Sequence, residues 1–203
     1  MRIRPAGPSA VLLELDDAEA VSGAYRLLTT ARNQGRLTAR EIVPAARTVL
    51  IDGVTDPGPL TALLREPTST PETERSTPTI KILATYDGDD IDDVARLWHT
   101  DRAGVVAIHT GTAFRVAFCG FAPGFAYLTG LDPRYHVPRR PSPRTRVPAG
   151  TVALAGPYSG VYPTASPGGW QCIGRTREVL FDLESDPPAL LTPGAVVRFA
   201  EAA

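Results

Sequence analysis

The chain has 203 residues, of which 43% are hydrophobic and 21% charged, and its formal net charge is -1. This length suits one large domain or two small ones, and the near-neutral charge argues against binding nucleic acid through a basic surface. No apolar run approaches the roughly 18 residues of a membrane helix. Pro5, Pro8 and Glu14 interrupt the short apolar run near the N-terminus, so a signal peptide is not predicted. We therefore expect a cytoplasmic protein without membrane or nucleic-acid partners.

Cysteine and histidine are too sparse for a metal centre or a disulfide framework. The two cysteines, Cys119 and Cys172, and the three histidines are scattered along the chain without metal-ligand spacing. Two cysteines do not make a disulfide framework, and in the cytoplasm free thiols are the rule. We expect no metal site and two free, buried thiols.

The first 78 residues predict a small α/β domain. A strand is expected at 10–15, a helix at 16–35, two short strands within 41–52 broken near Pro44, and a second helix at 57–66. Asp16 and Glu19 resemble a capping box at the start of the first helix. The apolar face of that helix is expected at Val21, Ala24, Tyr25 and Leu28. The order is strand, helix, strand, strand, helix. If one more strand follows the second helix, this order suggests a ferredoxin-like unit.

The polar segment from Ser69 to Pro78 reads as a linker, so we predict domains at 1–78 and 79–203. In the second domain the pattern predicts a helix at 89–100, with Trp98 in the core. The expected strands are 79–86, 113–118, 151–155, 170–174, 179–183 and 195–200. Many short strands separated by Gly and Pro turns indicate a barrel or a sandwich.

Three loops of the second domain combine residues that could bind a ligand. The aromatic loop, 120–128, reads "GFAPGFAYL" and sets Gly124 among rings that include Phe121 and Phe125. Glycine lets a backbone approach a ligand closely or adopt positive φ, so the rings could wall an apolar pocket. The alternative is a structural turn whose rings belong to the core.

The arginine loop, 137–150, reads "VPRRPSPRTRVPAG" and holds four arginines between stiff prolines. The planar guanidinium fork matches a carboxylate or phosphate. We expect Arg144 to face inward and Arg140 to face solvent. The alternative is a solvated basic loop.

The glycine loop, 162–176, places Gly168 and Gly169 directly before Trp170. This ring could stack on a planar ligand, or it could be a core residue behind a hairpin turn. His109 is the one candidate catalytic residue, but a lone histidine at a helix-to-strand junction is more often structural. The sequence contains no P-loop and no nucleophile elbow.

Four segments occur together in a family-specific order: "GFAPGFAYLTGLD", "VPRRPSPRTRVPAGTVALAG", "GVYPTASPGGWQCIGRT" and "LLTPGAVVRF". In these segments the chain resembles the allophanate hydrolase subunit 1 family. That family includes the B subunit of bacterial 5-oxoprolinase and the Kip-type inhibitor of a sporulation histidine kinase, and it is similar to part of the carboxyltransferase region of urea carboxylase. The resemblance implies an α+β fold, with a small N-terminal α/β domain followed by a cyclophilin-like β-barrel domain.

The resemblance also implies a subunit of a hetero-oligomeric, ATP-dependent amidohydrolase, most simply 5-oxoprolinase, inactive without its partners. ATP would be a co-substrate of the complex. The expected partner is a homologous cyclophilin-like subunit, of the type of allophanate hydrolase subunit 2 or the C subunit of 5-oxoprolinase, with the A subunit of 5-oxoprolinase as a possible third member. The expected substrate-binding residues are Phe121, Pro123, Gly124, Phe125, Arg139, Arg144, Pro148, Gly168, Gly169 and Trp170.

Two other functions share this fold. A regulatory module that inhibits a sensor histidine kinase is the main alternative, and the sequence does not separate it from the enzyme subunit. A prolyl isomerase is a third interpretation, but the chain has no match to the cyclophilin catalytic pattern. The Ser-Ser-Lys motif of amidases is also absent from the sequence, so we do not expect this chain to be an amidase of that type.

Overall fold

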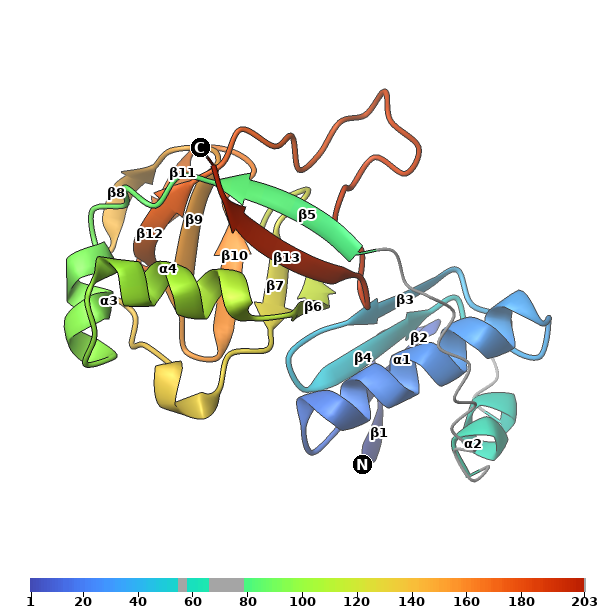
Figure 1. The fold of residues 1–203 in the computed structure, drawn as a ribbon. Helices are drawn as coiled ribbons and strands as arrows, with labels where there is room; N and C mark the ends of the chain where they lie inside the picture. The colour runs from blue at the N-terminus through green and yellow to red at the C-terminus, as the bar shows by residue number, and fades with distance from the viewer. Residues whose placement is uncertain (55–57, 66–78, 203) are drawn as a thin grey trace. The chain divides into compact units, whose positions relative to one another are not determined.

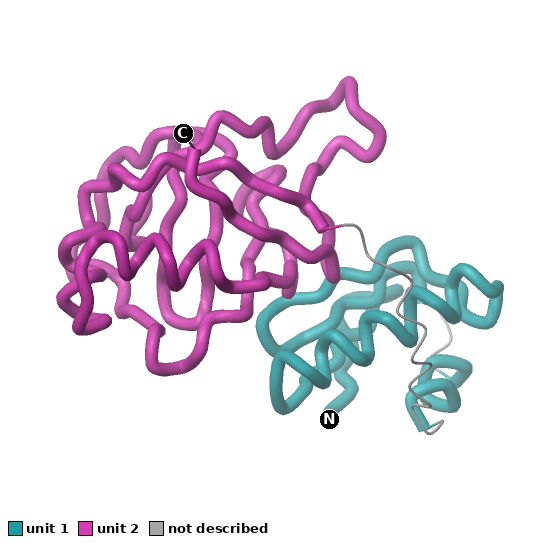
Figure 2. Tube along the Cα trace, viewed as in Figure 1, with its two compact units in different colours: residues 1–75 teal, residues 76–203 magenta. Residues whose placement is uncertain are grey.

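The computed structural model describes residues 1–54, 58–65 and 79–202. The chain divides into two compact units, residues 1–75 and residues 76–203 (Figure 2). The predicted linker and the predicted domain boundary at residue 78 both lie outside the described residues. Each unit has its own hydrophobic core.

The N-terminal unit is an antiparallel sheet with one long helix on its face (Figure 1). Its elements are β1 (Arg2–Pro5), β2 (Ala10–Glu14), α1 (Ala18–Asn33), β3 (Glu41–Pro44), β4 (Thr48–Asp52) and α2 (Gly58–Arg65). The sheet order is β1-β2-β4-β3, so β4 lies between the two strands that α1 connects, as a ferredoxin-like unit requires. The edge strand next to β2 is β1, which the sequence pattern did not predict. The possible final strand after α2 falls outside the described residues.

The start of α1 differs by one residue from the prediction. Asp17, not Asp16, is the N-cap, and its side chain accepts a hydrogen bond of 2.8 Å from the Ala20 N–H. The Asp16 carboxylate instead accepts a hydrogen bond from the Met1 amino group, and the Asp16 backbone carbonyl accepts one from Arg47. The spacing from Asp16 to Glu19 fits a capping box, but the structure places the cap at the next aspartate. The expected apolar face is confirmed, with Val21 and Leu28 buried.

In the second unit, β8 (Arg144–Val147) and β11 (Ser166–Gly168) form a separate antiparallel pair. The main sheet of this unit has seven strands and is nearly closed, and this confirms the expected barrel. Its strands are β5 (Thr79–Ala84), β6 (Phe114–Cys119), β7 (Ala126–Thr129), β9 (Thr151–Ala155), β10 (Tyr158–Val161), β12 (Gln171–Arg175) and β13 (Val196–Glu201). They lie in the order β12-β9-β10-β7-β6-β13-β5, with only the β13–β5 pair parallel among the named strands of this sheet. A bridge from Thr85 to Arg175, with hydrogen bonds of 2.8 Å in both directions, joins its two ends.

Two helices pack on the barrel, α3 (Ile91–Leu97) and α4 (Arg102–Gly111), with a short 3-10 turn, η1 (Pro133–Tyr135), farther along the chain (Figure 1). Trp98 follows α3 directly. Its ring is buried in the barrel core, and its Nε1–H donates to the Tyr135 carbonyl at 3.0 Å. The prediction that Trp98 belongs to the core is confirmed.

The expected strand at 179–183 is wrong. This stretch lies in the long loop that projects between β12 and β13 (Figure 1), and only Phe181 forms an isolated bridge, with Ala189. Leu180 is buried, whereas Val179 and Leu183 are exposed. A short run of apolar residues imitates a strand here, but Leu180 is the one residue of 179–183 that is buried. Within the described ranges, no helix is both long and apolar enough to cross a membrane.

Candidate binding site

The three loops meet at a cavity of about 260 Å³ in the barrel unit. The walls contain rings from the aromatic loop, two residues of the arginine loop and the turn of the glycine loop. The lining residues are Phe121, Phe125, Tyr127, Arg139, Pro143, Tyr162, Pro167, Gly168, Gly169 and Trp170. Pro123, Gly124, Arg144 and Pro148, which the sequence analysis placed in the site, do not line it.

Aromatic rings form a large part of the cavity lining. The ring of Phe125 lies 5.4 Å from those of Tyr162 and Trp170, measured between centroids, in edge-to-face contacts. All three side chains are buried in one cluster. Burial raises the pKa of Tyr162 to about 12, so its phenol stays neutral near pH 7. Trp170 is 5% exposed and also lines the cavity. Its ring is therefore a core residue, as one interpretation held, and it is also placed where it could contact a ligand, as the other held.

The glycines make room for these rings. A Cβ on Gly168 would lie 2.3 Å from the hydroxyl oxygen of Tyr162, a distance at which the ring would have to move. Gly124 has φ +82°, and a Cβ there would lie 2.7 Å from the Cβ of Phe181. Gly124 therefore packs the aromatic loop onto the loop that follows β12, and it does not line the cavity. The paired glycines and rings of the sequence thus reflect a backbone that passes very close to large side chains.

Phe121 is the unusual member of the cavity. It adopts φ +72°, which is uncommon for a bulky residue, and its side chain is 61% exposed. Its ring lies edge-on to Phe125 at 5.2 Å between centroids. A strained backbone at a cavity is typical of functional sites. The sequence carried no signal for this conformation.

The arginine loop is arranged differently from the expectation. Arg144 does turn inward, but its Nη2 donates to the Asp90 carboxylate at 2.8 Å. Arg140, expected to face solvent, is only partly exposed, and its Nη1 donates to the same Asp90 oxygen. The solvent-facing prediction for Arg140 is therefore wrong. The cation that lines the cavity is Arg139, an exposed residue next to this ion pair.

Sequence reasoning missed Asp90. Its side chain is 2% exposed and accepts hydrogen bonds from both arginines and from the Cys172 N–H, the last at 2.7 Å. Burial tends to raise the pKa of this carboxyl, but the hydrogen bonds from Arg144 and Cys172 outweigh it, and the pKa is lowered. In "YDGDDIDDVA" nothing distinguishes Asp90 from the neighbouring aspartates, because its partners lie 50, 54 and 82 residues away.

His109 lies on α4, where its ring packs against Phe114 and Phe199, and it does not line the cavity. Its Nδ1 is 2.7 Å from the Tyr86 hydroxyl and its Nε2 is 2.9 Å from Ser159 Oγ. The ring is fully buried, and burial lowers its pKa to about 3. This placement supports the structural interpretation of His109, since its ring is fully buried away from the cavity lining.

The cysteines are also unsuited to chemistry. Both are free; Cys172 is buried, and Cys119 is half-buried rather than fully buried as expected. Burial raises the pKa of each thiol to about 11, which disfavours a reactive thiolate. Among the described residues, no group of three or more His, Cys, Asp and Glu side chains is placed to hold a metal ion.

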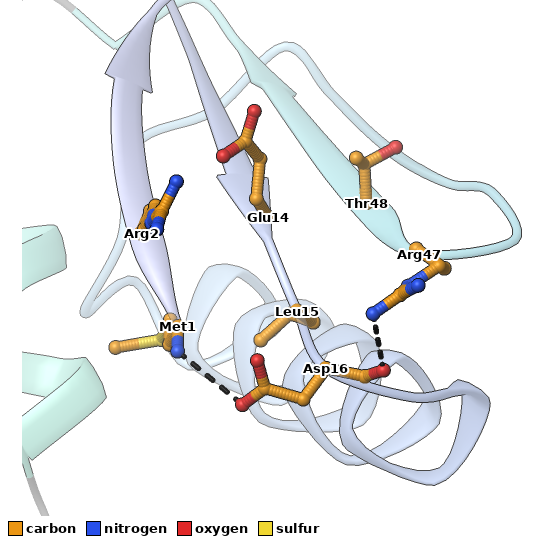
Figure 3. A pocket seen from close by; sticks show the side chains of 7 residues that line it. All are labelled: Met1, Arg2, Glu14, Leu15, Asp16, Arg47 and Thr48. Carbon is orange, nitrogen blue, oxygen red and sulfur yellow. Dashed lines mark hydrogen bonds and ion pairs between the residues drawn. The ribbon is translucent and has the colours of Figure 1, made fainter.

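A second depression, of about 510 Å³, lies in the N-terminal unit (Figure 3). Asp16 lies between Met1 and Arg47 in it: the Met1 amino group is 3.4 Å from the Asp16 carboxylate, and Arg47 donates to the Asp16 carbonyl at 2.8 Å. Glu14 pairs with Arg4 outside the depression, and no residue from the sequence-based site lies there. The cavity of the barrel unit is therefore the stronger candidate site.

Comparisons with known proteins agree with this architecture. Among curated proteins, the chain is 49% identical over 112 residues to the B subunit of 5-oxoprolinase from Escherichia coli O157:H7 and 45% identical over 112 residues to that of Haemophilus influenzae. These matches cover 55% of this chain and 51% and 53% of the two relatives. The chain thus spans about half the length of the curated relatives it matches.

Two solved structures extend the likeness to nearly the whole chain. The conserved protein PH0987 from Pyrococcus horikoshii matches with a TM-score of 0.60 and 36% identity, covering 99% of this chain and 97% of that one. The protein TTHA0988 matches with a TM-score of 0.81 and 31% identity, covering 96% of this chain and 40% of that one. The family described as carboxyltransferase domain, subdomain C and D, matches residues 1–191. The resemblance seen in the sequence is confirmed, and the chain belongs to the carboxyltransferase subdomain C and D family, alongside the B subunit of 5-oxoprolinase.

Proposed function

We propose that this chain is a subunit of an ATP-dependent 5-oxoprolinase, which opens the lactam of 5-oxoproline with water to give glutamate while ATP becomes ADP and phosphate. The relatives named as the B subunit of 5-oxoprolinase support this assignment. The observation that carries it is the cavity, where aromatic walls surround a small volume and a single arginine lines the wall.

The size of the cavity favours a small substrate. Pockets for drug-sized ligands measure roughly 300–1,000 Å³, and this cavity measures about 260 Å³. A five-membered lactam suits that volume better than a nucleotide does. We therefore place 5-oxoproline here, and we expect ATP to bind elsewhere in the assembled complex.

The chemistry of the walls matches the substrate. A lactam ring is flat and compact, and aromatic faces and edges such as those of Phe125 and Trp170 bury such a ring well. Its carboxylate needs a cation. Arg144 and Arg140 are already paired with Asp90, so we assign carboxylate recognition to Arg139 through a charge-assisted hydrogen bond.

This chain would bind and orient the substrate. An amide resists hydrolysis, and phosphorylation of its oxygen by ATP would lower that barrier in the complete enzyme. Neither His109 nor the cysteines offer a reactive group at the cavity, so the reacting groups would come from partner subunits. The proposed partner is the homologous cyclophilin-like subunit of the C type, together with a third subunit of the A type. The exposed ring of Phe121 at the cavity suits a contact with such a partner.

The test is reconstitution with and without this chain. The chain is co-expressed with its homologous cyclophilin-like partner and the third subunit, and 5-oxoproline-dependent ADP release is measured. We expect one complex, and ADP release that is lost when this chain is omitted. A complex that forms but releases no ADP with 5-oxoproline, or release that does not depend on this chain, would refute the proposal. Inhibition of a sensor histidine kinase by the chain would instead favour the regulatory alternative.

A further inference from the structure

Asp90 connects three segments that are distant in the sequence. Its Oδ1 accepts hydrogen bonds from Arg140 and Arg144 of the arginine loop, and its Oδ2 accepts from the Cys172 N–H in the glycine loop. Its own backbone N–H donates to the Cys172 carbonyl at 2.9 Å. One carboxylate oxygen is therefore fixed by the backbone of β12, and the other oxygen binds both arginines.

The backbone before Asp90 is fixed just as firmly. A Cβ on Gly88 would lie 2.3 Å from the carbonyl oxygen of Cys172, so only glycine lets this segment lie so close to β12. The Gly88 N–H also donates to the Ile173 carbonyl at 3.2 Å. Asp90 therefore stands on a rigid base, and the ion pairs attach the arginine loop to that base.

The residue between these attachments is Arg139. On one side, the Pro138 carbonyl accepts a hydrogen bond of 3.1 Å from Gln171 Nε2. On the other side, the Arg140 N–H donates to the Gly169 carbonyl at 2.8 Å, and its guanidinium bonds to Asp90. Both neighbours of Arg139 are tied to the glycine loop, while Arg139 itself is exposed at the cavity. Such fixing reduces the entropy lost when a long side chain orders around a ligand.

We propose that Asp90 is a positioning residue, which clamps the arginine loop to the glycine loop and so holds Arg139 where it meets the carboxylate of the substrate. Asp90 does not line the cavity. The part of this proposal that concerns the substrate rests on the proposed function. The part that concerns the clamp rests on the geometry alone, and the two parts are tested separately.

The clamp is tested with Asp90→Asn, which keeps the shape of the side chain and removes its charge. The matched control is Asp89→Asn, because the Asp89 side chain is 83% exposed and 3.7 Å from Arg144. Both variants are made in a Trp98→Phe background. The chain has two tryptophans, so Trp170 is then the one that remains and the fluorescence reports on it alone. We expect Asp90→Asn to melt cooperatively and to increase acrylamide quenching of Trp170 about twofold or more, whereas Asp89→Asn leaves the quenching unchanged. A folded Asp90→Asn chain with unchanged quenching would overturn the clamp.

The substrate part is tested in the assembled complex. Asp90→Asn should raise the KM for 5-oxoproline by about tenfold, the scale of one misaligned charge-assisted contact, with a smaller change in kcat. An equal KM in a folded complex would overturn the positioning role. If Asp90→Asn does not fold, Arg140→Met removes one ion pair and leaves the Arg144 and Cys172 bonds, and it should change quenching and KM in the same directions. Unchanged values in that variant would reject the proposal. Failure of the wild-type complex to hydrolyse 5-oxoproline would reject the proposed function and leave the quenching result standing.

Discussion

The contact between Gly168 and Tyr162 makes a sharp prediction about the cavity wall. In Gly168→Ala the new Cβ would lie 2.3 Å from the Tyr162 hydroxyl oxygen and 2.9 Å from the ring carbon that carries it. Tyr162 is among the largest fully buried side chains and packs against Phe125 and Trp170, so its ring cannot shift without disturbing these contacts. Overpacking of this kind costs about 1–3 kcal/mol. For a chain of this size, that corresponds to a fall of roughly 2–12 °C in Tm.

Gly169→Ala is the matched control. Its Cβ would lie 3.7 Å from the nearest atoms, those of Pro143, which is an ordinary van der Waals contact. Where the backbone tolerates a side chain, alanine in place of glycine is neutral or stabilises the fold by about 0.4–1 kcal/mol. We therefore expect Gly169→Ala to melt at or slightly above the wild-type temperature.

Thermal melting followed by tryptophan fluorescence measures the difference. Trp98 and Trp170 are the only tryptophans of the sequence, and both belong to the barrel unit, so the signal reports that unit. Gly168→Ala should melt clearly below both Gly169→Ala and wild type. Equal melting temperatures for the two variants, or a larger loss in Gly169→Ala, would refute the close approach of Gly168 to Tyr162.

Three further perturbations test other parts of the structure. Trp170→Ala should destabilise the barrel unit by about 3–5 kcal/mol, seen as a lower Tm in the Trp98 fluorescence; a small change would mean that the ring is a wall without a core role. Gly124→Ala, at φ +82° and with 2.7 Å to Phe181, should lower Tm by several degrees, and an unchanged Tm would contradict its packing against the loop after β12. His109 stays neutral in the fold down to pH about 3, while in the unfolded chain it takes up a proton below pH about 6.5. Between these two pH values only the unfolded chain binds the proton, so the free energy of unfolding is highest above pH about 6.5. It should fall by about 2 kcal/mol between pH 7 and pH 5. Urea unfolding of wild type and His109→Gln at both pH values measures this, and parallel profiles would contradict it.

Periodicity predicted most of the elements because the cores of both units are built from local patterns. The face of α1 follows from the spacing of Val21 and Leu28, and β9 coincides with the predicted strand at 151–155. The stretch at 179–183 misled the prediction, because a short apolar run fits a strand but does not supply a pairing partner. A sequence pattern describes one segment, whereas a strand needs a neighbour.

The candidate site was predictable in its walls but not in its charges. Aromatic residues make up only 7% of the chain, so rings beside glycines mark the aromatic and glycine loops from the sequence alone. The choice among the arginines depends on Asp90, whose partners on the arginine and glycine loops are 50 to 82 residues away. Long-range pairing of this kind leaves no local pattern, and for this reason the sequence favours Arg144 over Arg139 as the anion-binding residue.

The central claim, that the cavity of the barrel unit holds the carboxylate-bearing lactam, is tested most directly by kcat/KM for 5-oxoproline in the assembled complex with Arg139→Lys. Lysine keeps the positive charge and removes the planar fork. Arg146→Lys, an exposed position on the same loop that does not line the cavity, is the control. We predict that Arg139→Lys lowers kcat/KM roughly ten- to hundredfold, whereas Arg146→Lys changes it less than about twofold. Equal and small effects of the two substitutions, with the complex intact, would contradict the claim.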